Sequence, residues 1–413
     1  RDGCDELVIR ARDDVRDPGQ PAGKQSARYD SWGCLYTRTT GIWQTVWLEA
    51  VPKTYVERVV AWPDLDSGRF GVQVFTRGDG RYGGRARALA EGTEVAAVEF
   101  SGRGTTCHSL SLELPDPRSW GPEDPFLYEL EVELDGPGGA DSVTTRAGLR
   151  KFHCEGNRWF LINEPIFLRT VLDQGFYRDG IYTAPSVDAL EYDIDMSMAF
   201  GFNGARLHQK AFEPQFLHMC DSKGYLVFGE YADWGCSRSR GNAFDTPEYA
   251  QNMLREWREA LLRDLSHPAI IGWCPQNESW EGERGVWGEW LTRQLYRLSK
   301  TIDPSRPTLD TSGYFHYETD VFDTHDYNQD PSVLEEHYAP LREGNYEEAF
   351  SNNKKQLDYR GEQPFYVSEM GGLKWVLEGE RDAGWGYGKA PKTEEEFMTR
   401  FRGLAEALML NPG

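Results

Sequence analysis

Residues 267–280 read H-P-A-I-I-G-W-C-P-Q-N-E-S-W. The stretch opens with a turn, continues as an apolar run typical of a strand buried on both faces, and ends on an amide, a carboxylate and a hydroxyl. Parallel α/β sheets and barrels build sites in this way, with polar side chains at the carboxyl ends of their strands. Taken alone, the pattern is equally typical of a solvated loop that begins near Glu278.

A second stretch has the same design. Residues 364–372 read P-F-Y-V-S-E-M-G-G, so an apolar strand again ends in a glutamate, Glu369. Two strands of this kind make Glu278 and Glu369 a candidate pair for shared chemistry.

The composition limits the classes of partner. The 413 residues suggest two or three domains, and 39% hydrophobic and 13% aromatic residues predict a packed core. A formal charge of −22 argues against nucleic acids and anionic membranes, which need a basic surface, and favours neutral ligands. No apolar run approaches the length of a membrane span, and none resembles a signal peptide.

The cysteines are odd in number, scattered, and without a C-x-x-C pair. This usage predicts reduced, buried thiols in a cytoplasmic protein rather than a disulfide framework. The seven are Cys4, Cys34, Cys107, Cys154, Cys220, Cys236 and Cys274.

Residues 1 to about 150 are predicted to be all-β. Residues 5–12 alternate, and residues 41–51 form a strong strand pattern that ends at Pro52. The spacing of the strands predicts one or two β-sandwiches, the first of them incomplete. Residues 81–87 are basic and glycine-rich, and we interpret them as a hairpin tip rather than an RNA contact. The further short strands expected are Val56–Ala61, Phe70–Phe75, Glu94–Phe100, His108–Leu114 and Leu127–Leu134.

After residue 150, strands alternate with helices. Repeated units of this kind, whose strands end in polar residues, predict a (β/α)8 TIM barrel. We count seven strands, so the barrel is expected to be truncated after strand seven. The strands are Pro165–Thr170, Asn203–Leu207, Tyr225–Phe228, the Trp273 strand, Thr308–Asp310, Val321–Thr324 and the Glu369 strand. The helices begin at Ser186, Pro214, Glu248 and Trp287, near Leu334, and at Thr393.

Polar residues at the strand ends are expected to share one rim. Two carboxylates across such a rim suit glycosidic bond cleavage, in which one donates a proton and the other attacks the anomeric carbon. An arginine nearby would favour the ionised form of the nucleophile. The rim residues are Asp173, Arg206, His208, Glu230, Trp234, Asn277, Glu278, His325, Tyr327 and Glu369. Tryptophans that could stack on sugars, or equally pack in the core, are Trp234, Trp280, Trp375 and Trp385.

Competing chemistries find little support. The sequence has no H-E-x-x-H, no Walker A motif and no G-x-S-x-G elbow. The eight histidines show no metal-ligand spacing. We therefore expect neither a cofactor nor a metal.

Several segments together resemble glycoside hydrolase family 2, the β-galactosidase and β-glucuronidase group. Asn277-Glu278 matches its acid/base motif, and residues 368–371 match its nucleophile motif. Residues 202–208 resemble its N-x-x-R segment, and residues 220–230 its C-D-x-x-G-hydrophobic-E segment. Residues 39–49 resemble the last strands of its jelly-roll sugar-binding domain.

The resemblance implies three domains and a mechanism. Residues 1–52 would be the C-terminal part of the jelly roll, 53–148 an immunoglobulin-like sandwich and 149–413 the incomplete barrel. Glu278 would be the acid/base, Glu369 the nucleophile, and Asn277 would hold the sugar 2-hydroxyl. Retention of anomeric configuration is implied, with the carboxylates roughly 5–5.5 Å apart.

The sequence departs from the family at several positions. Gln209 occupies the place of a usual histidine, and His208 lies one residue earlier. Tyr327 is our candidate for the tyrosine beside the nucleophile. Lys374 could partly replace the carboxylate clamp of β-glucuronidases, although a surface role is the simpler interpretation. The candidate substrate-binding residues are Asn277, Arg206, His208, Asp173, Trp234, His325, Tyr327 and Trp375.

We therefore expect a retaining exo-β-glycosidase for terminal β-linked hexosides, with β-galactosides as the preferred substrates. The alternatives are a β-glucuronidase or another family member, a non-catalytic carbohydrate-binding relative, and an endo-acting glycanase. Carbohydrate is the expected partner. A homo-oligomer formed through the sandwich domains is compatible with the sequence.

Overall fold

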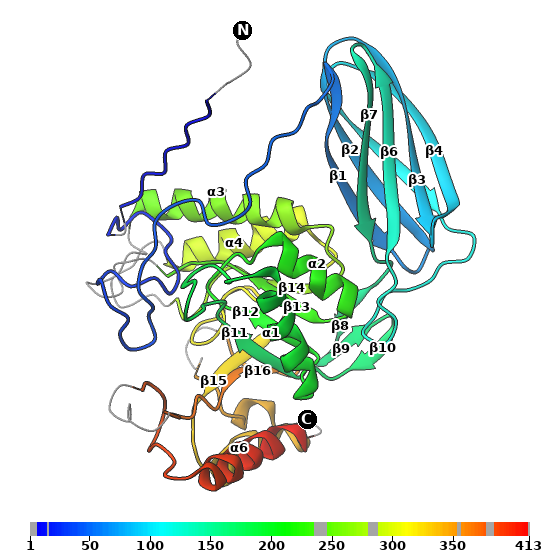
Figure 1. Cartoon of the computed structure of the whole chain (residues 1–413). Coiled ribbons are helices and arrows are strands. Elements are labelled where there is room, and N and C mark those ends of the chain that lie inside the picture. Colours follow the sequence, from blue (N-terminus) through cyan, green and yellow to red (C-terminus); the bar gives the residue numbers. More distant parts are fainter. Residues whose placement is uncertain are drawn as a thin grey trace.

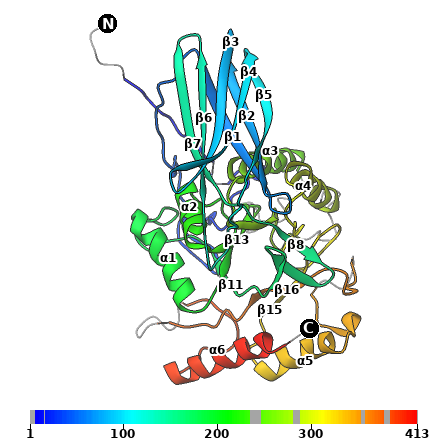
Figure 2. The same cartoon turned by 90° about the vertical axis from the view of Figure 1, so that its right-hand side faces the viewer.

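The computed structural model divides into an elongated β-sandwich and a larger α/β part. Figure 1 and Figure 2 show the sandwich at one end and the parallel strands in the middle. Two helices, α5 (Pro331–Arg342) and α6 (Glu394–Met409), lie at the other end. Each part has its own apolar core. The residues described are 6–14, 16–234, 246–279, 288–352, 357–376 and 384–411.

The sandwich consists of a three-stranded and a four-stranded antiparallel sheet. All five short strands predicted for this region are present, because alternate residues such as Phe70, Val72 and Val74 point into a shared core. The first sheet has the order β1 (Thr54–Asp64), β2 (Arg69–Gly78), β5 (Thr106–Glu113). The second has the order β4 (Thr93–Arg103), β3 (Arg81–Ala90), β6 (Tyr128–Gly136), β7 (Gly139–Ala147).

The prediction for residues 81–87 was wrong. These residues begin β3, which pairs with both β4 and β6. Gly84 is needed here because a Cβ atom would lie 2.3 Å from the ring of Phe100 on β4. The basic side chains pair across the sheet, as when Arg87 donates to Glu131 on β6. The glycines serve close packing, not a turn.

The two strands predicted before residue 52 do not form. Residues 6–12 and 41–51 have no strand, and no neighbouring strand among the described residues pairs with them. Val46, Trp47 and Leu48 are 54%, 66% and 85% exposed. A single extended segment cannot satisfy its backbone hydrogen bonds, so a strand-like sequence needs a partner strand to become one.

A small hairpin sheet joins the sandwich to the α/β part. It has the order β10 (Glu164–Ile166), β9 (Arg158–Leu161), β8 (Phe152–Glu155). The predicted first barrel strand therefore began too early, because residues 164–166 turn back at Asn163 and pair antiparallel with β9. Just before β8, the buried Arg150 donates to the backbone carbonyls of Pro268 (2.9 Å) and Ile270 (2.6 Å).

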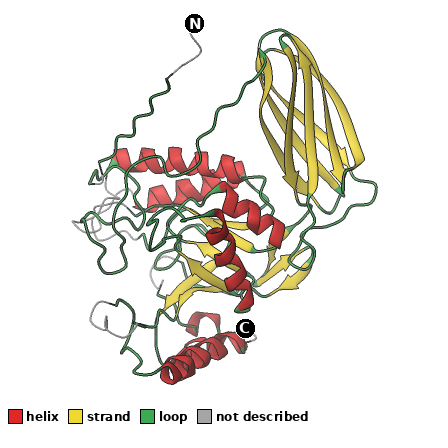
Figure 3. Ribbon diagram, in the orientation of Figure 1, coloured by secondary structure: helices red, strands yellow, loops and turns green. Residues whose placement is uncertain are grey.

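The parallel strands occur in the predicted order and are yellow in Figure 3. Residues 308–312 lie beside the strand that contains Trp273 and extend its sheet, since Thr308 bridges Trp273 and Ser312 bridges Asn277 in parallel. Within the described residues these segments occupy seven of the eight strand positions expected for a barrel. The strands are β11 (Thr170–Asp173), β12 (Gly204–Leu207), β13 (Leu226–Glu230), β14 (Ile270–Cys274), β15 (Phe322–Asp326) and β16 (Phe365–Met370).

Three helix ends lie where their capping residues predict them. Ser186 and Thr393 accept hydrogen bonds from backbone N–H groups of α1 and α6, and Gly224 ends α2 with φ 71°. The helix expected near Leu334 begins slightly earlier, at Pro331 after the cap Asp330, and ends at Arg342; a short 3-10 turn, Tyr346–Glu348, follows. The helices are α1 (Val187–Ala199), α2 (Pro214–Lys223), α3 (Pro247–Asp264), α4 (Gly288–Ile302), α5 (Pro331–Arg342) and α6 (Glu394–Met409).

Two sequence expectations concern the chain's surroundings. Among the described residues, no helix is long and apolar enough to cross a membrane. The described cysteines are free thiols, but Cys107 is exposed, so the prediction that the thiols are buried was wrong at this position. Cys107 lies on β5, whose alternate side chains face solvent. Cys4 and Cys236 lie outside the described residues.

The start of β14 is held by a buried ion pair. Arg306 is 2% exposed and pairs with Asp303 at 2.5 Å. The guanidinium also donates to the carbonyls of Leu265 (3.0 Å), His267 (2.8 Å) and Ile270 (2.6 Å). One side chain thus satisfies three backbone acceptors that precede or begin the strand.

We predict that Arg306→Met lowers the free energy of unfolding by about 3–5 kcal/mol, because it leaves Asp303 buried without its cation. Arg297→Met is the matched control, since Arg297 pairs with Glu318 at the surface and its loss should cost less than about 1 kcal/mol. Urea unfolding of both variants measures the difference. Equal costs would contradict the structural role given to Arg306.

Candidate active site

Glu278 and Glu369 lie together at the carboxyl ends of the parallel strands. Glu369 is in β16, and Glu278 follows β14, whose five residues are all buried. A carboxylate oxygen of Glu278 lies within 4.8 Å of one of Glu369. Because β14 is apolar throughout, its first polar residues emerge only at the rim, which places Glu278 there.

Arg206 joins the strands that surround this pair. From β12 its guanidinium donates to Glu230 at the end of β13 and to Glu369 in β16. It also donates to Oδ1 of Asn277 at 3.1 Å. Burial disfavours the charge, but Glu230 and Glu369 outweigh that effect and hold the pKa of Arg206 well above its usual value. The guanidinium therefore remains a cation beside Glu369.

Glu230 and His208 form a buried pair next to Arg206. Its Oε1 lies 3.0 Å from Nδ1 of His208 and accepts the backbone N–H of Gln209 at 2.9 Å. Both side chains are almost fully buried. Burial raises the pKa of Glu230 to about 7, although Arg206 opposes the shift. His208 therefore belongs to the network beneath the pair of glutamates.

A second buried carboxylate, Asp233, holds the segment that carries Asn277 and Glu278. It accepts the backbone N–H of Asn277 at 3.1 Å and hydrogen bonds from the side chains of Ser279 and Gln209. Gln209 thus fixes Asp233, from the position where the family usually has histidine. Burial raises the pKa of Asp233 to about 8, although the hydrogen bond from Ser279 opposes the shift.

Asn277 presents an amide donor to the site. Its carbonyl accepts the indole N–H of Trp234 at 2.6 Å, and its Oδ1 accepts from Arg206. The Nδ2 atom is buried and has no hydrogen-bond partner among the described residues. Trp234 is 3% exposed, with the ammonium of Lys24 over its ring at 4.4 Å. Trp234 therefore supports Asn277 as a buried wall.

The backbone of Glu278 has an unusual conformation. Its φ is 47°, in the left-handed region that non-glycine residues rarely adopt, at a cost of about 1–3 kcal/mol. The residue is held by its N–H, which donates to the carbonyl of Ser312 at 2.7 Å. This conformation occurs four residues after the end of β14 and sets the direction of the carboxylate.

His325 lies between the two glutamates. Its Nδ1 is 2.9 Å from Oε1 of Glu278, and its Nε2 is 3.4 Å from Oε1 of Glu369. The atoms of His325, Glu278 and Glu369 that could donate to a metal ion lie within 4.8 Å of one another, a spacing that would also suit such an ion. Each of these donors already has a protein partner, however, so we interpret the group as an ion-pair cluster.

Tyr327 holds the second oxygen of Glu369. Its hydroxyl donates to Oε2, and burial together with Glu369 raises the pKa of Tyr327. Tyr387 stacks on Tyr327 with ring centroids 3.7 Å apart, and Trp385 packs on Tyr387 at 5.2 Å. Tyr387 was missed in the sequence because a tyrosine in an irregular loop carries no recognisable pattern.

The remaining predicted residues lie apart from the pair. Asp173 ends β11, where its carbonyl accepts the N–H of His208 (2.7 Å) and burial raises its pKa to about 6. Trp375 is 43% exposed and packs on Phe397 of α6 at 5.1 Å. The prediction for Trp280 lies outside the described residues. The Lys374 clamp stays a prediction.

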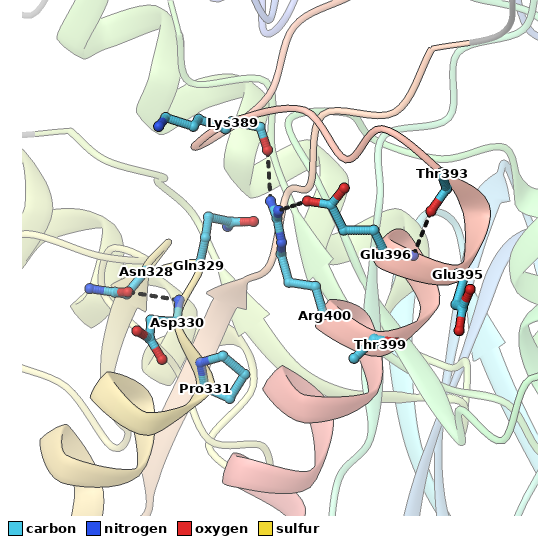
Figure 4. Close-up of a pocket in the computed structure, with 10 residues that line it drawn as sticks. All are labelled: Asn328, Gln329, Asp330, Pro331, Lys389, Thr393, Glu395, Glu396, Thr399 and Arg400. Atoms are coloured by element: carbon cyan, nitrogen blue, oxygen red, sulfur yellow. Dashed lines mark hydrogen bonds and ion pairs between the residues drawn. The ribbon is translucent and has the colours of Figure 1, made fainter.

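A separate cavity of about 770 Å³ lies between the loop after β15 and the first turns of α6 (Figure 4). Arg400 donates there to the carbonyl of Lys389 (2.7 Å) and pairs with Glu396 (3.1 Å). Among the described residues, none of those predicted for the site lines this cavity. The carboxylate pair, not the cavity, therefore marks the candidate active site.

Comparison with known families agrees with this geometry. Residues 161–372 match the family described as Glycosyl hydrolases family 2, TIM barrel domain, and residues 54–150 match Glycosyl hydrolases family 2. The chain belongs to glycosyl hydrolases family 2. The arrangement of sandwich and parallel α/β part is the one these two matches describe.

The relatives carry two kinds of name. A β-galactosidase of Leuconostoc mesenteroides is 28% identical over 65% of this chain and 27% of its own length. A putative β-glucuronidase of Formosa agariphila is 27% identical over 91% of this chain and 44% of its own. This chain thus spans less than half the length of either relative.

Solved structures share the fold. A β-D-glucuronidase of Dictyoglomus thermophilum has a TM-score of 0.66 at 19% identity, and covers 86% of this chain and 60% of its own. A family 2 β-galacturonidase of Eisenbergiella tayi has a TM-score of 0.67 at 21% identity, over 86% and 63%.

We predict that Asp233 makes stability fall as pH rises. The folded carboxyl has a pKa of about 8, while the unfolded value is near 3.9, so between these values only the folded state keeps the proton. The free energy of unfolding then declines by at most about 1.4 kcal/mol per pH unit. Asp233→Asn should flatten this decline between pH 5 and 8 in urea unfolding.

Asp330→Asn is the control for that measurement. Asp330 is exposed, and its hydrogen bonds with Ser332 lower its pKa, so it releases its proton below this pH range in both states. An unchanged slope in Asp233→Asn would show that Asp233 does not hold the proton.

Proposed function

We propose that the protein is a retaining exo-β-glycosidase that hydrolyses terminal β-linked hexosides, with β-galactosides as the preferred substrates. The observation that carries this proposal is the approach of Glu278 and Glu369 to within 4.8 Å. Retaining enzymes keep their carboxyl groups about 5–5.5 Å apart, whereas inverting enzymes need roughly 6.5–9.5 Å for a water molecule.

The surrounding residues support distinct roles for the two glutamates. Glu369 receives hydrogen bonds from Arg206 and Tyr327 on its two carboxylate oxygens, which fix its orientation and suit a nucleophile. Glu278 lies across from it and would donate its proton to the leaving oxygen, then take one from water in the second step. The buried Nδ2 of Asn277 is a donor suited to the sugar 2-hydroxyl.

The charge of the site favours a neutral sugar. Arg206, the buried cation beside the two glutamates, already pairs with the carboxylates of Glu230 and Glu369. A uronic acid would bring a further negative charge into these surroundings, at an electrostatic cost. The competing candidate is a β-glucuronidase, because the relative that covers 91% of this chain carries that name.

The remaining predictions concern the chain's surroundings. The described cysteines are free thiols, which fits the reducing cytoplasm expected from the sequence. A homo-oligomer, the immunoglobulin-like class of the sandwich and an incomplete barrel also stay proposals.

We predict that Glu278→Gln and Glu369→Gln each lower kcat by about 10²–10⁴-fold on a nitrophenyl β-glycoside. The exposed Glu289→Gln on α4 is the matched control and should keep wild-type activity. NMR of the first product should show the β-anomer. An α-anomer would exclude retention, and binding of sugar without turnover in the wild type would favour a carbohydrate-binding relative.

We predict that kcat/KM is at least about tenfold higher for nitrophenyl β-galactoside than for the β-glucuronide, because burying one unpaired charge costs more than 1.4 kcal/mol. β-Glucoside and β-mannoside complete the panel. A preference for the glucuronide that Lys374→Ala removes would establish the alternative. Cleavage inside polymers, rather than at chain ends, would indicate an endo-acting glycanase.

A further inference from the structure

A buried polar network lies behind the two glutamates and has no role in the proposed reaction so far. We call it the His325 network; it consists of His325, Ser312, Ser368, Asp323 and His316. His325 reaches Glu278 with Nδ1, and its Nε2 lies 2.9 Å from the hydroxyl of Ser312. All five side chains are buried.

Asp323 fixes the direction of these hydrogen bonds. Its carboxylate accepts from the hydroxyls of Ser312 (2.9 Å) and Ser368, and from the N–H of Gly313 (2.9 Å). A serine hydroxyl has one hydrogen, so Ser312, which gives it to Asp323, can only accept from Nε2 of His325. Nε2 therefore carries a hydrogen, and only Nδ1, which faces Glu278, remains to gain or lose a proton.

His316 keeps Asp323 ionised. Its Nδ1 lies 2.7 Å from Asp310 and its Nε2 2.9 Å from Asp323. Burial opposes the charge, but the two carboxylates outweigh it and raise the pKa of His316 to about 10. Burial disfavours the charge of Asp323 as well, but His316 and the hydrogen bonds outweigh that effect and lower the pKa of Asp323 to about 2. The direction of the network is thus the same across the neutral pH range.

The negative charge of the active site moves during a double displacement. In the first step the proton of Glu278 goes to the glycosidic oxygen, the bond to the leaving group breaks, and Glu369 forms a bond to the anomeric carbon. Glu369 loses its charge as an ester while Glu278 becomes ionised. The second step, with water, reverses both changes. His325 contacts both positions, at 2.9 Å and 3.4 Å.

We propose that His325 is a positioning residue that stays protonated and contacts, in both steps, whichever glutamate carries the negative charge. The inference rests on the proposed function. It assigns His325 to the two glutamates, whereas the sequence suggested a substrate contact.

The groups that face His325 agree with a protonated ring. Glu278 follows β14, Glu369 comes from β16 and Asp323 from β15 itself; all are acidic. Burial disfavours the charge, but these three carboxylates outweigh it and raise the pKa of His325. The ring centroids of Tyr314 and Tyr327 each lie 6.2 Å from the ring centroid of His325. Arg206 is the nearby cation, and its guanidinium donates a hydrogen bond to Glu369, one of the three carboxylates that face His325.

Histidine NMR tests the contact without any substrate. In protein labelled with ¹⁵N-histidine, His325 should be protonated on both nitrogens at pH 7, and Glu278→Gln should lower the pH at which it titrates. Ser312→Ala, which removes the acceptor of Nε2, should also change the titration. The exposed Glu289→Gln on α4 lies outside this network and should leave the titration unchanged. A neutral His325 at pH 7, or a titration unaffected by Glu278→Gln, would overturn the proposal.

Kinetics with an activated substrate test the role in the reaction. A dinitrophenyl β-glycoside needs no proton from Glu278, so the basic limb of kcat/KM against pH should report His325 in the wild type. His325→Gln should lower kcat about 10²-fold for dinitrophenyl and phenyl glycosides alike, and should lose that limb. A merely structural role would lower the rate without changing the pH profile.

The proposed function and the role of His325 can be disproved separately. If the wild type hydrolyses no β-glycoside, the proposed function is wrong, and the NMR titration still decides whether His325 is protonated by its contacts. If hydrolysis occurs but the basic limb persists in His325→Gln, only the role of His325 is wrong. Ser312→Ala keeps the kinetic test open if His325→Gln does not fold.

Discussion

One buried cation, the guanidinium of Arg206, is shared among acceptors that come from three other strands. It binds Glu230 at the end of β13, Asn277 after β14 and Glu369 in β16. Buried carboxylates are tolerated only when a cation and hydrogen bonds compensate them. Without this side chain, two acidic groups would face each other at the rim with no common partner. The mutual placement of the strand ends therefore depends on a single residue of β12.

The two glutamates were predictable from the sequence because a carboxylate that follows a buried run has few positions open to it other than the rim. Arg206 and Asn277 were found in the same way, at the ends of their strands. Asp233, Ser312 and Ser368 were not, since a single aspartate or serine looks the same in a loop as in a buried network. Their role depends on which strands become neighbours, and local sequence does not encode that information.

The errors in the fold have a similar origin. The glycines of β3 read as a turn, but close packing against Phe100 requires glycine at residue 84 in a central strand. Conversely, residues 41–51 have strand composition and form no strand. Both cases show tertiary context overriding local preference. The helices were predicted more accurately, because residues such as Ser186 and Gly224 act within their own turn.

The contact of Arg150 with the carbonyls of Pro268 and Ile270 has a consequence for how this protein can be divided. The arginine belongs to the segment that leaves the sandwich, yet it caps the strand whose far end carries Glu278. A barrel expressed without that segment would lose the donor to the carbonyl of Pro268 and leave the carbonyl of Ile270 with Arg306 alone, at the start of β14. Recombination or truncation near residue 150 would therefore disturb the strand that leads to Glu278, so the sandwich and the barrel are best inherited and engineered as one unit.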